Sequence, residues 1–205
     1  MDNLPISNSR YKDRNYWDER YHHEETYEWF GAFSRFEHLL KEEIQTDETI
    51  LVLGCGNSSL SYEMFMSGYR SITNIDFSAI CIEKMASKYA TCSGMEWKVM
   101  DAKALQFEDE SFDVVLEKGT LDAMMVDEKD PWNVSQETTE TIDQVLKEIP
   151  CGQFLCNLLL LSECSMLLSS ELIKLLLNLQ LLSDILSWLG VLIPLLQASN
   201  DHHHS

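Results

Sequence analysis

Two glycines one residue apart, followed by an acid further along the chain, are the residues best suited to bind a ligand. Gly54 and Gly56 follow the apolar run 50–53, and Asp76 lies 22 positions after Gly54. Glycine permits positive φ in a tight turn and allows a ligand to approach the backbone. An acid at the end of the next strand can accept hydrogen bonds from ribose hydroxyls. The spacing therefore predicts a nucleotide-like ligand.

Both features also have simpler interpretations. A Gly-x-Gly turn can lead into a helix in any α/β protein, and Asp76 could cap a helix that begins near Ser78. The ligand site is favoured because the turn and the acid occur in the order that such a site requires. An NAD-dependent dehydrogenase is disfavoured, because Ser59 replaces the third glycine of the dinucleotide fingerprint and no substrate domain follows.

The surrounding pattern predicts alternating strands and helices. Apolar runs predict strands at 50–53, 72–75, 97–100 and 112–116. Helices are expected after Ser58 and Ser59, near Ser78 and after Ser135. This alternation predicts right-handed βαβ units and a doubly wound, mostly parallel, Rossmann-like α/β sheet. Acids follow three strands at the shared carboxyl edge: Asp76, Asp101 and Glu117.

Aromatic residues gather before the first strand. Trp17 and Tyr21 are four positions apart and would share one helix face, and Trp29 follows them. These rings could simply pack a helix onto the domain. A helical stripe from Phe33 to Ile44 then leads into the first strand.

Composition limits the partners. The chain has 205 residues, of which 45% are hydrophobic, and a net charge of −19. It has no Lys/Arg cluster for nucleic acid, and its acidity suits a cationic small molecule or a basic protein. The six cysteines contain no C-x-x-C pair, and no secretory leader is recognised. We therefore expect reduced thiols, a cytoplasmic protein and no metal site.

Longer blocks of the sequence resemble class I S-adenosylmethionine-dependent methyltransferases. The blocks are Tyr16-Trp17-Asp18 with Tyr21, and residues 27–31 (YEWFG), 51–58 (LVLGCGNS) and 113–123 (DVVLEKGTLDA). More narrowly, they are similar to the methyltransferase-like proteins that include the lysine methyltransferases of translation elongation factor 1-alpha. The resemblance runs from about residue 11 to about residue 149.

The resemblance implies S-adenosyl-L-methionine as the cofactor. Gly54 and Gly56 would pass under its methionine part, and Asp76 would hold the ribose hydroxyls, with Phe77 beside the adenine. The adenine amino group would be bordered by Asp101 and Ala102. Further residues implied to line the pocket are Lys118, Trp17, Tyr21 and Trp29. Aromatic faces suit the sulfonium cation, because they attract cations by about 0.5–2 kcal/mol.

The resemblance also implies methyl transfer to a lysine of a basic protein such as a translation elongation factor. A lysine ammonium must lose a proton before it can attack. Glu117 and Asp122 could orient that amine, or they could hydrogen-bond the loop after the fourth strand. A protein that binds the cofactor but transfers methyl weakly or not at all is the other hypothesis.

The resemblance ends after Ile149. We therefore expect a methyltransferase domain at 1–149 and an atypical leucine-rich segment at 150–205, packed on the domain or trailing from it. Residues 150–155 are a shortened form of the turn and fifth strand expected of the family, so the sheet is predicted to be incomplete there. The tail is predicted to form amphipathic helices such as 171–189, with a lipid-associated tail as the alternative. A span is disfavoured, because the charge-free run 185–200 falls short of the ~20 residues required.

Overall fold

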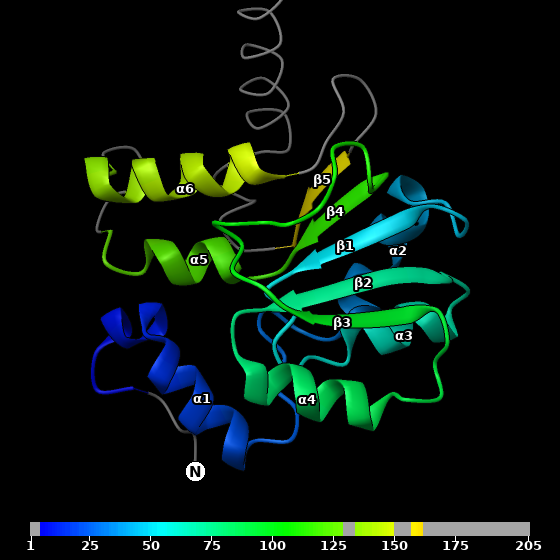
Figure 1. The fold of residues 1–205 in the computed structure, drawn as a ribbon, viewed down its shortest axis with the longest axis horizontal. Coiled ribbons are helices and arrows are strands. Elements are labelled where there is room, and N and C mark those ends of the chain that lie inside the picture. The colour runs from blue at the N-terminus through cyan, green and yellow to red at the C-terminus, as the bar shows by residue number, and fades with distance from the viewer. Residues whose placement is uncertain (1–4, 129–133, 150–156, 162–205) are drawn as a thin grey trace, which may run out of the picture. The chain divides into compact units, whose positions relative to one another are not determined.

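A parallel five-stranded sheet forms the centre of the protein (Figure 1). The computed structural model describes residues 5–128, 134–149 and 157–161, which all belong to one compact unit, Met1–Leu167. The strand order is β3-β2-β1-β4-β5. The strands are β1 (Thr49–Leu53), β2 (Ser71–Asp76), β3 (Met95–Val99), β4 (Val114–Glu117) and β5 (Asn157–Leu160). The predicted Rossmann-like α/β fold is confirmed.

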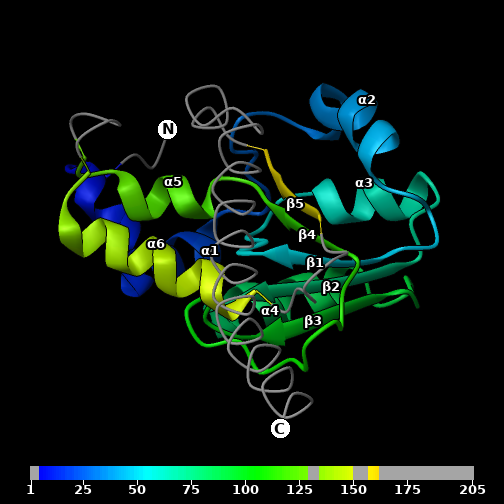
Figure 2. The same cartoon turned by 90° about the horizontal axis from the view of Figure 1, so that it is seen from above.

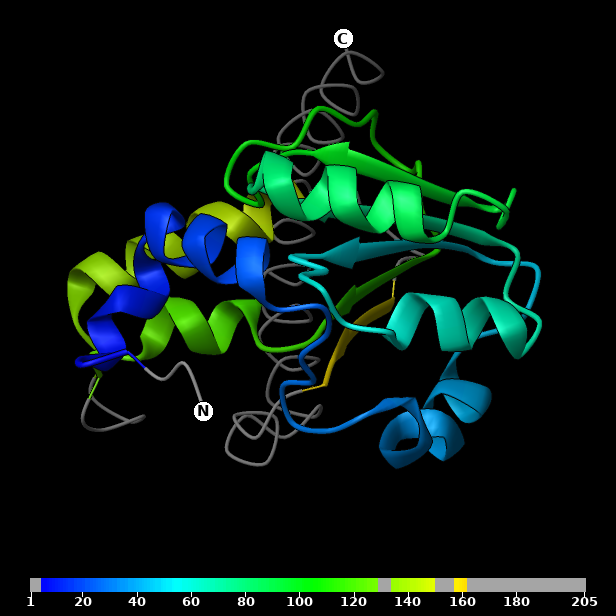
Figure 3. The same ribbon diagram turned by 90° about the horizontal axis from the view of Figure 1, so that it is seen from below.

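Helices cover both faces of this sheet. They are η1 (Asn8–Lys12), α1 (Arg14–His23), α2 (Phe33–Glu43), α3 (Leu60–Met66), α4 (Ala79–Lys88), α5 (Thr120–Met125) and α6 (Gln136–Glu148). Figure 3 shows α3 and α4 on one face, whereas α6 lies on the opposite side (Figure 2). In the described part of the chain, no helix has the length and apolar character needed to cross a membrane.

The central strand β1 sends alternate side chains into two cores. Ile50 and Val52 belong to the cluster that includes the buried side chains of α3 and α4. Leu51 and Leu53 belong to a second cluster with Val145 of α6. Successive strand residues point to opposite faces, so a strand covered on both faces is apolar throughout. This explains why the run before Gly54 is uninterrupted by polar residues.

Two helix starts are confirmed in atomic detail. The Ser78 hydroxyl accepts a hydrogen bond from the Cys81 N–H at the start of α4, and the Ser135 hydroxyl accepts one from the Thr138 N–H at the start of α6. Helix α5 was not predicted. It has only six residues, too few to show a helical period, and it begins directly after Gly119, which has φ of 90°.

Three strand positions differ from the prediction. β3 begins two residues earlier and β4 two residues later than expected, and the fifth strand lies at Asn157–Leu160 rather than within 150–155. β5 pairs in parallel with β4, inside the leucine run that was expected to belong to a helical tail. A buried strand and a buried helix both appear as continuous apolar runs, so periodicity does not separate them. The boundary at residue 149 stays a prediction, and helix 171–189 lies outside the described residues.

Candidate cofactor site

A cavity of about 650 Å³ lies at the carboxyl ends of the strands. Small-molecule sites have volumes of about 300–1,000 Å³ and occur at this edge of α/β sheets. Helices α1, α5 and α6 lie beyond the ends of β2 and β3 in Figure 1, and residues of all three line the cavity. The lining includes every residue predicted for the cofactor: Trp17, Tyr21, Trp29, Gly54, Gly56, Asp76, Phe77, Asp101, Ala102 and Lys118.

The glycine turn is shaped by its neighbours as well as by any ligand. Gly54 and Gly56 have φ of 58° and 52°, in the left-handed region that favours glycine. A Cβ on Gly54 would lie 2.0 Å from Oγ1 of Thr120, and a Cβ on Gly56 would lie 3.0 Å from the hydroxyl of Tyr21. The Thr120 hydroxyl donates to the Leu53 carbonyl at 3.1 Å, so the first residue of α5 packs directly on the turn.

We expect Gly54→Ala to lower the free energy of unfolding by about 2 kcal/mol, more than Gly56→Ala does. Both variants place alanine at positive φ, which costs about 1–2 kcal/mol. Only the first also forces a backbone-attached methyl group into Thr120. Urea unfolding of both variants measures the difference. Equal stability of the two would show that the Thr120 contact does not restrict the turn.

Asp76 connects the glycine turn to the start of α4. It is 3% exposed. One carboxylate oxygen accepts from the Gly56 N–H at 3.0 Å and the other accepts from the Ser78 N–H at 2.9 Å. Burial raises the pKa of Asp76 to about 6, although the two N–H donors act in the opposite direction. Asp76 therefore lies in the cavity wall and bonds the residue that precedes α4, whereas the suggested cap of that helix is made by Ser78 and not by Asp76.

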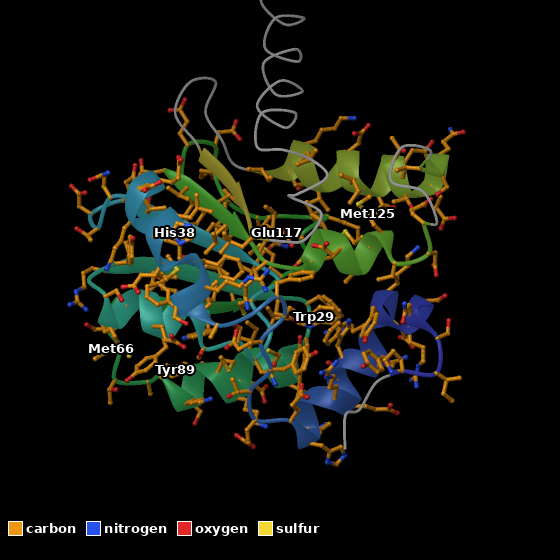
Figure 4. All side chains as sticks on the ribbon, turned by 180° about the vertical axis from the view of Figure 1, so that it is seen from behind. Trp29, His38, Met66, Tyr89, Glu117 and Met125 are labelled. Atoms are coloured by element: carbon orange, nitrogen blue, oxygen red, sulfur yellow. The ribbon has the colours of Figure 1, made fainter. Side chains whose placement is uncertain are left out.

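The aromatic residues form one continuous wall of the cavity. Trp17 and Tyr21 stack with ring centroids 5.6 Å apart, and Trp29 lies 6.1 Å from Trp17. The indole N–H of Trp17 donates to the Tyr11 carbonyl at 2.7 Å. Tyr11 also lines the cavity and was not predicted as a site residue. Trp29 lies against the residues that follow β4, because a Cβ added to Gly119 would lie 3.4 Å from the Cβ of Trp29. Figure 4 labels Trp29 together with Glu117, the last residue of β4.

Lys118 and Glu28 hold this aromatic wall against the glycine turn. The Lys118 ammonium donates to the Glu28 carboxylate at 2.8 Å and to the Trp29 and Gly31 carbonyls at 3.0 and 3.3 Å. The other Glu28 oxygen accepts from the Ser59 N–H at 2.6 Å. Burial raises the pKa of Glu28, but the hydrogen bonds from Lys118 and neighbouring groups outweigh it and the net shift is downward.

Glu28 was missed as a site residue by the sequence analysis. The signal that could have found it was its place inside the block at 27–31, one residue before Trp29. Lys118 was expected to line the pocket, and it does. Its ammonium, however, is directed to the loop that carries Trp29, so Lys118 acts by positioning that loop.

The two acids suggested for catalysis lie outside the cavity lining. Glu117 is 1% exposed, and one of its oxygens accepts from the N–H groups of Thr120 and Leu121. Burial and the neighbouring Asp122 raise the pKa of Glu117 to about 7. The other Glu117 oxygen and one Asp122 oxygen have no hydrogen-bond partner among the described residues. This geometry matches the loop-bonding alternative for Glu117.

We expect Glu117→Gln to raise the free energy of unfolding at pH 8 by about 1–2 kcal/mol, because glutamine is not charged when buried. The folded pKa of about 7 lies above the unfolded value of 4.5, so ionised Glu117 destabilises the fold, and this destabilisation has its full size above pH 7. The advantage of the variant should therefore shrink between pH 7 and 4.5. Denaturant unfolding across this range measures it, and a variant less stable than wild type at pH 8 would contradict the assignment.

The cavity fits S-adenosylmethionine on its own geometry. The glycine turn allows close approach of a ligand, the Asp76 carboxylate can accept from ribose hydroxyls, and ring faces suit a sulfonium. Among the described residues, no group of three His, Cys, Asp or Glu side chains could hold a metal ion. Residues 50–147 match the family model described as a methyltransferase domain. The chain therefore contains a class I methyltransferase domain, a family whose cofactor is S-adenosylmethionine.

Within this family, the chain is homologous to lysine methyltransferases. The proteins named EEF1A lysine methyltransferase 4 of Mus musculus and Bos taurus are each 48% identical to it over 160 residues, or 74% of this chain and 63% of each relative. The Homo sapiens eEF1A lysine and N-terminal methyltransferase is 35% identical, over 76% of this chain and 23% of the relative. The PH0226 protein of Pyrococcus horikoshii is a solved structure with 27% identity and a TM-score of 0.48, over 64% of this chain and 58% of that one. The chain thus spans less than two thirds of the first two relatives.

Proposed function

We propose that this chain binds S-adenosylmethionine in the cavity and transfers its methyl group to a lysine side chain of a basic protein. One observation carries the proposal: the glycine turn, the buried Asp76 and the rings of Trp17, Tyr21 and Trp29 line the same cavity. The names of the relatives support a translation elongation factor as the substrate.

The charge and the thiols support the rest of the proposal. A net charge of −19 suits a basic protein partner and disfavours nucleic acid. Cys55, Cys81 and Cys92 are free thiols, as expected in a reducing compartment, so we propose a cytoplasmic location.

The residues of the site would act mainly by alignment. Asp76 would hold the ribose, and the aromatic wall would place the sulfonium methyl group towards the acceptor nitrogen. Effective alignment of two reactants can supply about 7–11 kcal/mol of the barrier reduction. Lys118 contributes indirectly, because it fixes the backbone on both sides of Phe30 in the loop that carries Trp29. None of these steps needs a catalytic acid on the cofactor side.

Two measurements test the proposal. Calorimetry should detect binding of S-adenosylhomocysteine and no binding of NAD. Labelled methyl transfer from S-adenosylmethionine to purified elongation factor 1-alpha should then label lysine. Binding without transfer, to this substrate or to any protein of a cell extract, would favour the alternative of a cofactor-binding protein without turnover. A folded protein that binds neither compound would overturn the proposal.

A further inference from the structure

The charged residues of the cavity are nearly all neutralised by a partner. Among the described residues, four bases line the cavity: Lys12, Arg14, Lys103 and Lys118. Each base forms an ion pair with an acid. The pairs are Lys12–Asp127 at 2.8 Å, Arg14–Asp18 at 3.8 Å, Lys103–Asp101 at 3.9 Å and Lys118–Glu28 at 2.8 Å. The three acids of the lining are Asp76, Asp101 and Glu137. Two acids are therefore left without a basic partner, Asp76 and Glu137.

These two acids differ in the hydrogen bonds that their carboxylates already accept. Asp76 is buried, and both of its oxygens accept backbone N–H groups. The Glu137 side chain is exposed and has no hydrogen bond or ion pair with any described residue. It is the second residue of the 13-residue helix α6, where the helix N-terminus stabilises negative charge. Glu137 is thus a carboxylate without a cationic side-chain partner among the described residues, at a point where the cavity lining is exposed to solvent.

The position of Glu137 places it away from the predicted adenosine side. Phe77 and Ala102 follow β2 and β3, whereas Glu137 belongs to α6, which packs against α5 beyond the end of β4. The part of the cavity lining that α5 and α6 contribute also includes Met124 and Thr141. Such a wall offers an apolar surface to an alkyl stem and a carboxylate to its cationic end, which are the two parts of a lysine side chain.

We propose that Glu137 binds the ammonium group of the acceptor lysine at the entrance of the cavity and thereby selects a cationic acceptor. The inference rests on the proposed function, because it assigns a role within that reaction. It concerns recognition of the acceptor before its nitrogen loses a proton. Affinity for the cofactor should not depend on Glu137, since the residues assigned to the cofactor are contributed by other elements.

The direct test uses n-butylammonium as a mimic of the lysine side chain and n-butanol as its neutral counterpart. Each is titrated by NMR into the protein, with and without S-adenosylhomocysteine. Glu137→Gln should weaken butylammonium binding about fivefold and leave butanol binding unchanged. Glu140→Gln is the matched control, because Glu140 lies one turn later on α6 and does not line the cavity. Equal effects of the two substitutions, or no butylammonium binding by the wild-type protein, would overturn the inference.

Kinetics separates this inference from the proposed function. With elongation factor 1-alpha as the methyl acceptor, Glu137→Gln should raise KM for the protein substrate with unchanged affinity for S-adenosylhomocysteine. Methyl transfer with the same KM in the variant would keep the proposed function and remove the role of Glu137. Glu137-dependent butylammonium binding without any methyl transfer would keep the cation site and remove the proposed function.

Discussion

Replacing Lys118 with methionine is expected to lower the free energy of unfolding by about 3–5 kcal/mol, the range for breaking a buried ion pair by removing one partner. The Lys118 side chain is 6% exposed and that of Glu28 is 19% exposed. Without the ammonium, the Glu28 carboxylate and the Trp29 and Gly31 carbonyls lose a shared donor. The loop at 28–31 should loosen, and affinity for S-adenosylhomocysteine should fall with it.

Two controls make this result specific to the buried pair. Lys41→Met removes a lysine from the exposed ion pair with Glu37 and should change stability little. The double variant Glu28→Gln/Lys118→Met removes both charges and should be more stable than the sum of the single losses predicts. Denaturant unfolding of the wild type, Glu28→Gln, Lys118→Met and the double variant gives the coupling free energy. A coupling near zero would show that the pair does not hold the loop.

The sequence predicts the framework of the site well because its signals are local. The strand at 50–53 is apolar at every position since β1 is covered on both faces. The glycine turn needs positive φ, and glycine is the residue type that adopts positive φ most readily, so Gly54 and Gly56 indicate the turn directly. Asp76 follows from its distance along the chain, because the next strand of a βαβ unit returns to the same edge.

The parts that the sequence did not predict depend on contacts between distant segments. Glu28 meets Lys118 across 90 residues, and no local pattern reports that pairing. Glu137 looks like any acid in the first turn of a helix until the cavity and its paired bases are known. β5 was misplaced because an apolar parallel strand and a leucine-rich helix share the same composition, so the residue types alone do not separate them.

Asp76→Asn is expected to weaken binding of S-adenosylhomocysteine about tenfold to a hundredfold, equivalent to about 1–3 kcal/mol for charge-assisted hydrogen bonds. Asparagine keeps one acceptor oxygen, so the fold should survive, but it cannot accept from the Gly56 and Ser78 N–H groups and from two hydroxyls as a carboxylate can. Calorimetry at pH 8 measures the loss. Unchanged affinity in the folded variant would remove Asp76 from the cofactor site.

The pH dependence of the wild-type protein gives an independent test of the role of Asp76 in cofactor binding. Its folded pKa of about 6 lies above the ordinary pKa of 3.8 for an aspartate, so ionised Asp76 destabilises the ligand-free fold by on the order of 3 kcal/mol above pH 6. The stability of the ligand-free protein should therefore rise as pH falls from 6 to 4. Cofactor affinity should instead fall by up to tenfold per pH unit below 6, because a ribose hydroxyl binds the carboxylate and a protonated Asp76 must first ionise. Asp76→Asn should abolish both trends, whereas Glu117→Gln should leave the affinity profile in place. An affinity profile shared by wild type and Asp76→Asn would assign the titration to another group.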